Sequence, residues 1–92
     1  MDQMEKGVEF AKAYFKPRAK AIEELAARSE GFRDLCDDFA TASSEKLEWE
    51  RSSGPDRDER IGEYTELVGS LQIEIEQALD QAHVVPFTRP RQ

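Results

Sequence analysis

The stretch IGEYTELVGSLQIEIEQALDQA, residues 61–82, decides the fold of this chain. Its apolar side chains recur at steps of three and four, which at about 100° per residue places them in one sector of a helix. The members of this apolar stripe are Ile61, Tyr64, Leu67, Val68, Leu71, Ile75, Ala78, Leu79 and Ala82. Glutamate, glutamine and aspartate occupy much of the remaining circumference. The pattern predicts an amphipathic helix whose apolar side is shielded by other helices.

A second helix is predicted over residues 31–51, just before the first. Its apolar stripe consists of Phe32, Leu35, Cys36, Phe39 and Ala42. The sequence SSGPD at residues 52–56 is a strong turn signal, and Ser53 or Asp56 could cap the helix that follows. Because this link is short, the helices at about 31–51 and 57–82 are expected to lie side by side and antiparallel.

The same turn sets the expected pairing of residues across the hairpin. Facing residues should have numbers that sum to roughly 110, because the chain reverses near residue 55. Trp49 is then expected opposite Ile61, Phe39 opposite Leu71, and Lys46 opposite Tyr64.

The N-terminal part, about residues 3–28, predicts one helix or a kinked helix pair. Pro17 lacks a backbone donor, so a helix should end near Phe15 and restart with Pro17 in its first turn, or kink there. Ser29, Glu30 and Gly31 form only a weak break, and one long helix over about 18–51 is the alternative.

The fold class predicted from these elements is all-α, with residues 1–86 as one helical domain and residues 87–92 as an irregular tail. A hairpin alone leaves half of each apolar stripe in water, so the N-terminal helix, a second copy of the chain, or both should cover it. We expect a dimeric helical bundle. The candidate interface residues are Phe10, Tyr14, Phe15 and Ile73, the last lying opposite the apolar stripe of residues 61–82 beside Gly62 and Gly69.

Composition narrows the class of protein. The chain has 92 residues, a net charge of −7, one cysteine and one histidine. A single thiol allows no internal disulfide and suits a reducing compartment, and the N-terminus lacks the apolar run of a secretory signal, so a cytoplasmic location is expected. Residues 29–82 carry −10, whereas residues 1–28 carry +1. Such an acidic body disfavours direct binding to nucleic acid.

Site chemistry is sparse. Asp34, Cys36, Asp37 and Asp38 are the densest group of possible ligands, but a helix spreads them over different faces. Cys36 belongs to an apolar stripe and is expected to be a small buried residue. His83 can interact with the negative end of the preceding helix. We therefore expect no enzyme, no catalytic residue, no cofactor and no metal ligand set.

The basic N-terminal segment allows two interpretations. Phe10, Tyr14 and Phe15 alternate with lysines between Lys6 and Lys20, as in helices that lie on anionic membranes. Burial against the acidic hairpin explains the same pattern and is favoured.

Three segments, FRDLC at 32–36, WER at 49–51 and RIGEYTEL at 60–67, give a resemblance to a protein family. Residues 31–82 resemble small uncharacterised bacterial helical-hairpin proteins. The resemblance implies a hairpin and brings no activity.

The function expected from the sequence is a non-enzymatic protein–protein interaction or scaffold module, acting as a homodimer with a protein partner that the sequence does not identify. The alternatives are a peripheral membrane protein that uses the basic N-terminal helix, or a carboxylate metal binder.

Overall fold

The computed structural model describes residues 2–84, and the side chains of residues 6–82 within them. This part of the chain is helical apart from short turns and contains no strand, so the all-α prediction is confirmed. The elements in order are α1 (Asp2–Tyr14), the 3₁₀ helix η1 (Lys16–Arg18), α2 (Ala19–Arg28), α3 (Glu30–Arg51) and α4 (Arg57–Val84). The expected tail at residues 87–92 lies outside the described residues.

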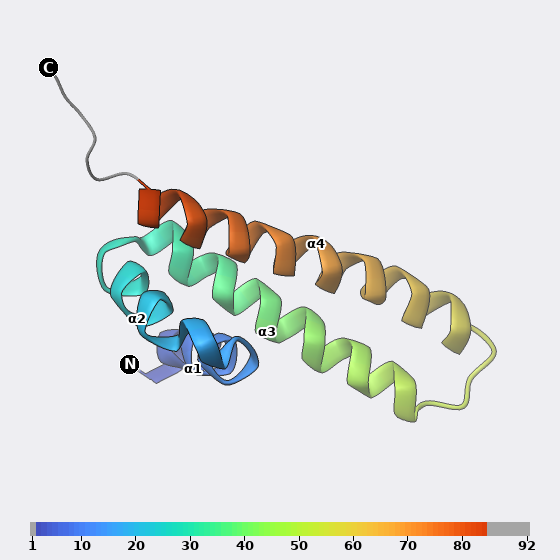
Figure 1. The fold of residues 1–92 in the computed structure, drawn as a ribbon. Helices are drawn as coiled ribbons and strands as arrows, with labels where there is room; N and C mark the ends of the chain where they lie inside the picture. The colour runs from blue at the N-terminus through green and yellow to red at the C-terminus, as the bar shows by residue number, and fades with distance from the viewer. Residues whose placement is uncertain (1, 85–92) are drawn as a thin grey trace, which may run out of the picture.

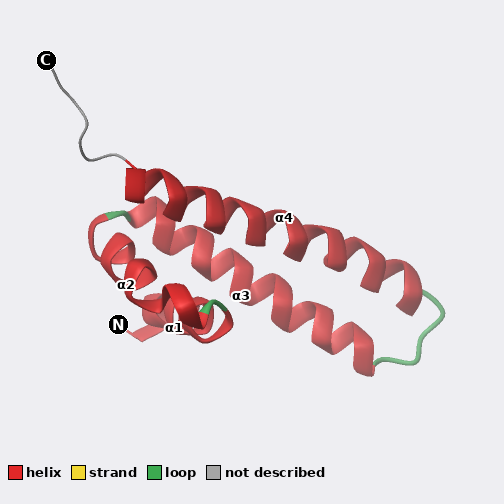
Figure 2. Ribbon diagram, in the orientation of Figure 1, coloured by secondary structure: helices red, strands yellow, loops and turns green. Residues whose placement is uncertain are grey.

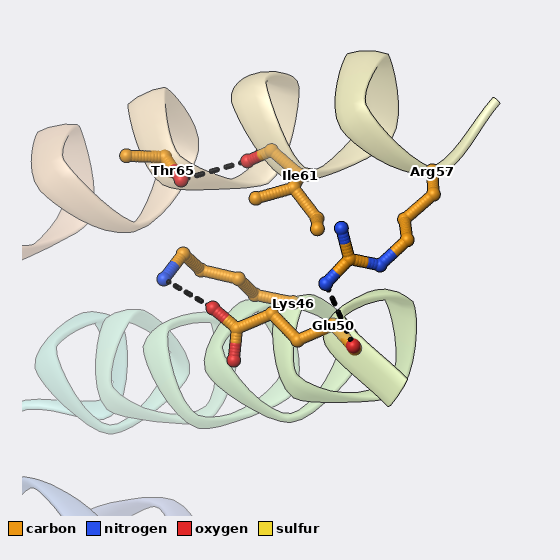
Figure 3. Close-up of polar contacts among 5 residues, drawn as sticks. All are labelled: Lys46, Glu50, Arg57, Ile61 and Thr65. Carbon is orange, nitrogen blue, oxygen red and sulfur yellow. Dashed lines mark hydrogen bonds and ion pairs between the residues drawn. The ribbon is translucent and has the colours of Figure 1, made fainter. Parts of the chain in front are cut away.

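Helices α3 and α4 form an antiparallel hairpin, as predicted (Figure 1). The loop of residues 52–56 joins them at one end (Figure 2). Near this loop the Arg57 guanidinium donates a hydrogen bond to the Glu50 carbonyl at 3.0 Å (Figure 3). Farther along, the Tyr64 hydroxyl donates to Glu45 Oε1 at 2.6 Å. These pairs lie close to the predicted alignment of the two helices. The Lys46 ammonium pairs with Glu50 on its own helix at 3.0 Å.

Two helix breaks divide the N-terminal part of the chain. Helix α1 ends at Tyr14, and Pro17 lies inside η1, so the break predicted near Phe15 is confirmed. Ser29 separates α2 from α3 with an extended backbone, φ −135° and ψ 108°. Its hydroxyl accepts a hydrogen bond from the Phe32 amide at 3.1 Å, which caps α3. The alternative of one helix over residues 18–51 is therefore wrong.

Helices α1 and α2 pack beside the hairpin at the end away from the loop (Figure 2). Gly7 permits the closest approach, because a Cβ built on it would lie 2.6 Å from the Asp37 Cα atom and 2.7 Å from its nitrogen. At the other end of this segment, Arg18 pairs with Asp80 of α4 at 3.0 Å. The N-terminal part thus bridges both helices of the hairpin.

The core lies where all four helices meet. An aromatic cluster joins α1 to α3, with the Phe39 ring 5.2 Å from Tyr14, 5.5 Å from Phe10 and 5.8 Å from Phe15 between centroids. The buried apolar residues are Val8, Ala11, Phe15, Ile22, Ala26, Phe32, Cys36, Phe39, Ala42, Leu71, Ile75 and Leu79.

The expectation that the whole stripe of residues 61–82 is shielded is wrong at Leu67, and Tyr64 and Val68 in the same half are only partly buried against the core. Leu71, Ile75 and Leu79 are buried, but Leu67 is 45% exposed. Two features explain this: Leu67 projects toward the edge of the hairpin that α1 does not line, and α2, which packs near that edge, has only 10 residues against 28 in α4. At about 1.5 Å per residue, α2 cannot reach the loop end of the hairpin.

Candidate interaction surface

An open furrow runs between α3 and α4 on the edge of the hairpin that α1 does not line. We call it the hairpin groove. Three hollows of about 490, 380 and 400 Å³ lie along it; the last two share Tyr64 and Leu67, and the first is separate, near Leu35 and Ala78. Its main lining residues are Leu35, Asp38, Ala42, Glu45 and Trp49 from α3, and Tyr64, Leu67, Leu71 and Ala78 from α4. Helix α2 contributes only at the far end, through Leu25 and Arg28.

Helical spacing explains why these residues share one edge. The lining positions of α3 follow steps of three and four, and those of α4 steps of three, four and seven, so each set projects on one side of its helix. Ala42 is small and buried, and Leu71 opposite it is buried as well. The floor of the groove is therefore apolar, and Leu67 rises from it half exposed.

Two polar contacts fix the groove near the loop. The hydrogen bond from Tyr64 to Glu45 crosses from α4 to α3. This hydrogen bond, together with partial desolvation and the charge of Glu45, raises the pKa of Tyr64. The Arg60 guanidinium lies 6.0 Å from the centre of the Trp49 ring and pairs with Glu63 at 3.0 Å. These contacts hold Tyr64 and Trp49 in place at the groove wall.

The rims of the groove are acidic along its middle, with Arg28 at the far end and Arg60 at the loop end. Asp38 and Glu45 border it on α3, and Glu63 borders it on α4. Glu74 lies seven residues after Leu67 and therefore on the same side of α4. Among the described side chains, no ion pair joins Asp38, Glu45 or Glu74 to a basic residue. Arg60, the basic residue beside the loop end of the groove, is already paired with Glu63.

The four interface residues expected from the sequence lie elsewhere. Phe15 is buried in the core of the chain itself. Phe10 and Tyr14 are partly exposed over Phe39, and the Tyr14 hydroxyl bonds Gln72 at 3.4 Å. Ile73 is 55% exposed, nearly opposite Leu71 around α4. None of them lines the hairpin groove, and their role in an interface stays a prediction.

The other residues considered for chemistry are Cys36, the acidic residues and His83. Cys36 is fully buried, which confirms the expected small core residue, and burial followed by the charge of Asp37 raises the pKa of its thiol to about 12. Over the described part of the chain, no three His, Cys, Asp or Glu residues gather as a metal site would require. The side chain of His83 lies outside the described residues.

The apolar side of the basic N-terminal segment is buried in the core of the chain itself. Val8, Ala11 and Phe15 are buried in the core, and Lys12 approaches Glu9 at 3.3 Å and Glu23 at 3.8 Å. This arrangement agrees with the interpretation in which the segment is buried against the hairpin. Within residues 2–84, no helix has the length and apolar character needed to cross a membrane.

The hairpin groove was not predicted from the sequence. The available signal was the position of Leu67 and Trp49 near the loop, beyond the reach of a short N-terminal helix. Comparison of the chain with protein-family models, with curated proteins and with solved structures finds no match. The resemblance of residues 31–82 to bacterial helical-hairpin proteins is therefore wrong, because those short segments do not amount to a detectable relationship.

Proposed function

We propose that this protein is a non-enzymatic interaction module that binds an α-helix of a protein partner in the hairpin groove. The single observation that carries the proposal is the open apolar floor between α3 and α4. Leu67 is half exposed there although it belongs to the same stripe as buried Leu71. Exposed apolar surface of this kind, rimmed by polar residues, marks interaction sites.

The shape of the groove supports a helical occupant. Two antiparallel helices present a long furrow, and a third helix laid along it would complete a bundle of the kind that α1 completes on the other edge of the hairpin. The Tyr64–Glu45 hydrogen bond and the Arg60–Trp49 contact join α3 to α4 across the groove in the unbound protein. A preformed site loses less free energy on binding than one that must be ordered.

Photo-crosslinking in the native cell tests this proposal by position. A photoreactive amino acid replaces Leu67 in the groove, and in a matched chain it replaces Leu47, which is 49% exposed on the other edge of the hairpin. The proposal expects a discrete protein adduct from position 67 and none from position 47. Equal adducts from both positions, or none from position 67, would contradict it.

The expected homodimer remains a second proposal, on a different face. Ile73 is exposed, and a Cβ added at Gly62 or Gly69 would meet nothing within 4 Å, so another backbone can approach there. Sedimentation equilibrium at micromolar concentration should give a dimer that Ile73→Glu converts to a monomer. A wild-type chain that stays monomeric across this range removes the dimer.

A further inference from the structure

We infer that the occupant of the hairpin groove is a basic amphipathic helix, with leucine-like anchors on one side and lysine or arginine along both flanks. The inference rests on the proposed function and adds the chemistry of the partner. It is carried by the juxtaposition of an apolar floor with two acidic rims.

Charge complementarity selects this partner. A helix seated on Leu67, Leu71 and Ala42 would place its flanking positions over Asp38 and Glu45 on one rim and over Glu63 and Glu74 on the other. Lysine or arginine at those positions would gain attraction, whereas glutamate there would meet like charge. Attraction across the rims also speeds association and makes it sensitive to salt.

A second copy of this chain fits the same groove poorly. The segment of residues 29–82, which holds the whole hairpin, carries −10, so two hairpins meeting groove to groove would oppose acidic rims. The N-terminal helices are the most basic part of the described chain, but their apolar residues Val8, Phe15 and Ile22 are already buried. A separate basic helix is therefore the occupant that the charges favour.

The length of the occupant follows from the groove. The lining residues of α3 run from Gly31 to Trp49, which at about 1.5 Å per residue spans roughly 27 Å. A helix of about 18 residues would fill it. Its anchors would recur at positions i, i+3 or i+4, and i+7, in the manner of helices bound in grooves.

A binding titration tests the inference with two designed peptides of 18 residues. Both carry the same leucine stripe and no tryptophan, and their flanking positions are lysine in one and glutamate in the other. The chain has one tryptophan, Trp49, which lines the groove, so its fluorescence reports occupancy directly. The anisotropy of labelled peptide gives a second readout. At low salt we expect the lysine peptide to bind at least ten-fold tighter than the glutamate peptide. Its affinity should fall as salt rises.

Matched variants separate the groove from general attraction to an acidic protein. Leu67→Asp should weaken binding of the lysine peptide at least ten-fold, while Leu47→Asp should change it less than two-fold. The pair Asp38→Asn and Glu74→Gln should weaken binding three-fold or more and flatten its salt dependence. The pair Glu48→Gln and Glu66→Gln removes the same charge from exposed positions outside the groove and should change binding less than two-fold. Circular dichroism melts establish that each variant is folded.

Three results would overturn the inference: equal affinity for the two peptides, equal effects of the Leu67 and Leu47 variants, or equal effects of the two charge pairs. The proposed function is tested separately, by the crosslinking experiment. A protein adduct from position 67 in cells, combined with no preference for the lysine peptide, would keep the groove as a docking site and reject the basic partner. An adduct between two copies of the chain would also keep the groove as a docking site and reject the basic partner. It would identify the occupant as a second copy.

Discussion

Gly7 shows how one residue sets the distance between two helices. Alanine at this position would drive its Cβ into the Asp37 backbone, at 2.6 Å from Cα, so α1 would have to move off α3. Gly7→Ala should therefore lower the free energy of unfolding by about 1–3 kcal/mol despite the better helix propensity of alanine. Urea denaturation followed by circular dichroism measures the change.

Gly62→Ala is the control for that experiment. Gly62 is also helical, but a Cβ there meets nothing within 4 Å. The substitution should raise the free energy of unfolding by about 0.5–1 kcal/mol. Opposite signs at the two glycines support the close approach of α1 to α3, and a stabilising Gly7→Ala would refute it.

Cys36 makes stability depend on pH in the alkaline range. Burial raises the pKa of its thiol from an ordinary value of 9.0 to about 12, so the folded state holds the proton between these values while the unfolded state loses it. The stabilisation is complete below pH 9 and is lost as the pH rises toward 12, by up to about 1.4 kcal/mol per pH unit.

The difference between wild type and Cys36→Ala isolates this effect from the other alkaline groups. Cys36→Ala should be less stable at pH 8, because a packed side chain is truncated. The gap between the two proteins should narrow as pH rises from 9 to 10.5. A gap that stays constant over this range would show that the thiol titrates normally in the folded state.

At the scale of the elements, Ser29 terminates one helix and starts the next. Its hydroxyl accepts the Phe32 amide at 3.1 Å, so Ser29→Ala should lower the free energy of unfolding by about 1 kcal/mol. Ser53 is an exposed serine in the other turn, and Ser53→Ala should stay within about 0.5 kcal/mol of wild type. Chemical denaturation of both variants measures this, and equal effects would remove the capping role of Ser29.

The elements also show what the sequence could and could not predict. Pro17 and the SSGPD turn gave correct breaks because proline and a Ser-Gly-Pro run act through local backbone geometry. The hairpin followed from two apolar stripes and a short loop. Ser29 remained ambiguous, because serine occurs inside helices as well as at their N-caps and Gly31 only weakens a helix, so local propensity did not decide between a break and a continuous helix.

At the scale of the whole molecule, the described residues form an elongated body with its core toward the end of the hairpin away from the loop. The apolar pattern of residues 61–82 alone does not predict this asymmetry. The stripe of residues 61–82 is uniformly apolar, and which half is covered depends on the reach of α1 and α2. The groove was missed for this reason, since it is the part of the stripe that the chain leaves open.

Two leucines of α4 test that asymmetry. Leu79 is 2% exposed and Leu67 is 45% exposed. Leu79→Ala should lower the free energy of unfolding by about 2–5 kcal/mol, and Leu67→Ala by less than about 1 kcal/mol. Urea denaturation at one pH compares them. Similar losses at both positions would show that the loop end of the hairpin is as well covered as the other end.

The central claim is that the hairpin groove is the surface where a partner helix docks. The most direct measurement is a two-dimensional ¹⁵N–¹H NMR titration of the full chain with the lysine peptide. The account predicts shifts at the Trp49 indole and at the amides of Ala42, Leu67 and Leu71, with Leu47 and Ile73 unchanged. Shifts concentrated at Leu47, Ile73 or the N-terminal helices, with the Trp49 indole unmoved, would contradict it.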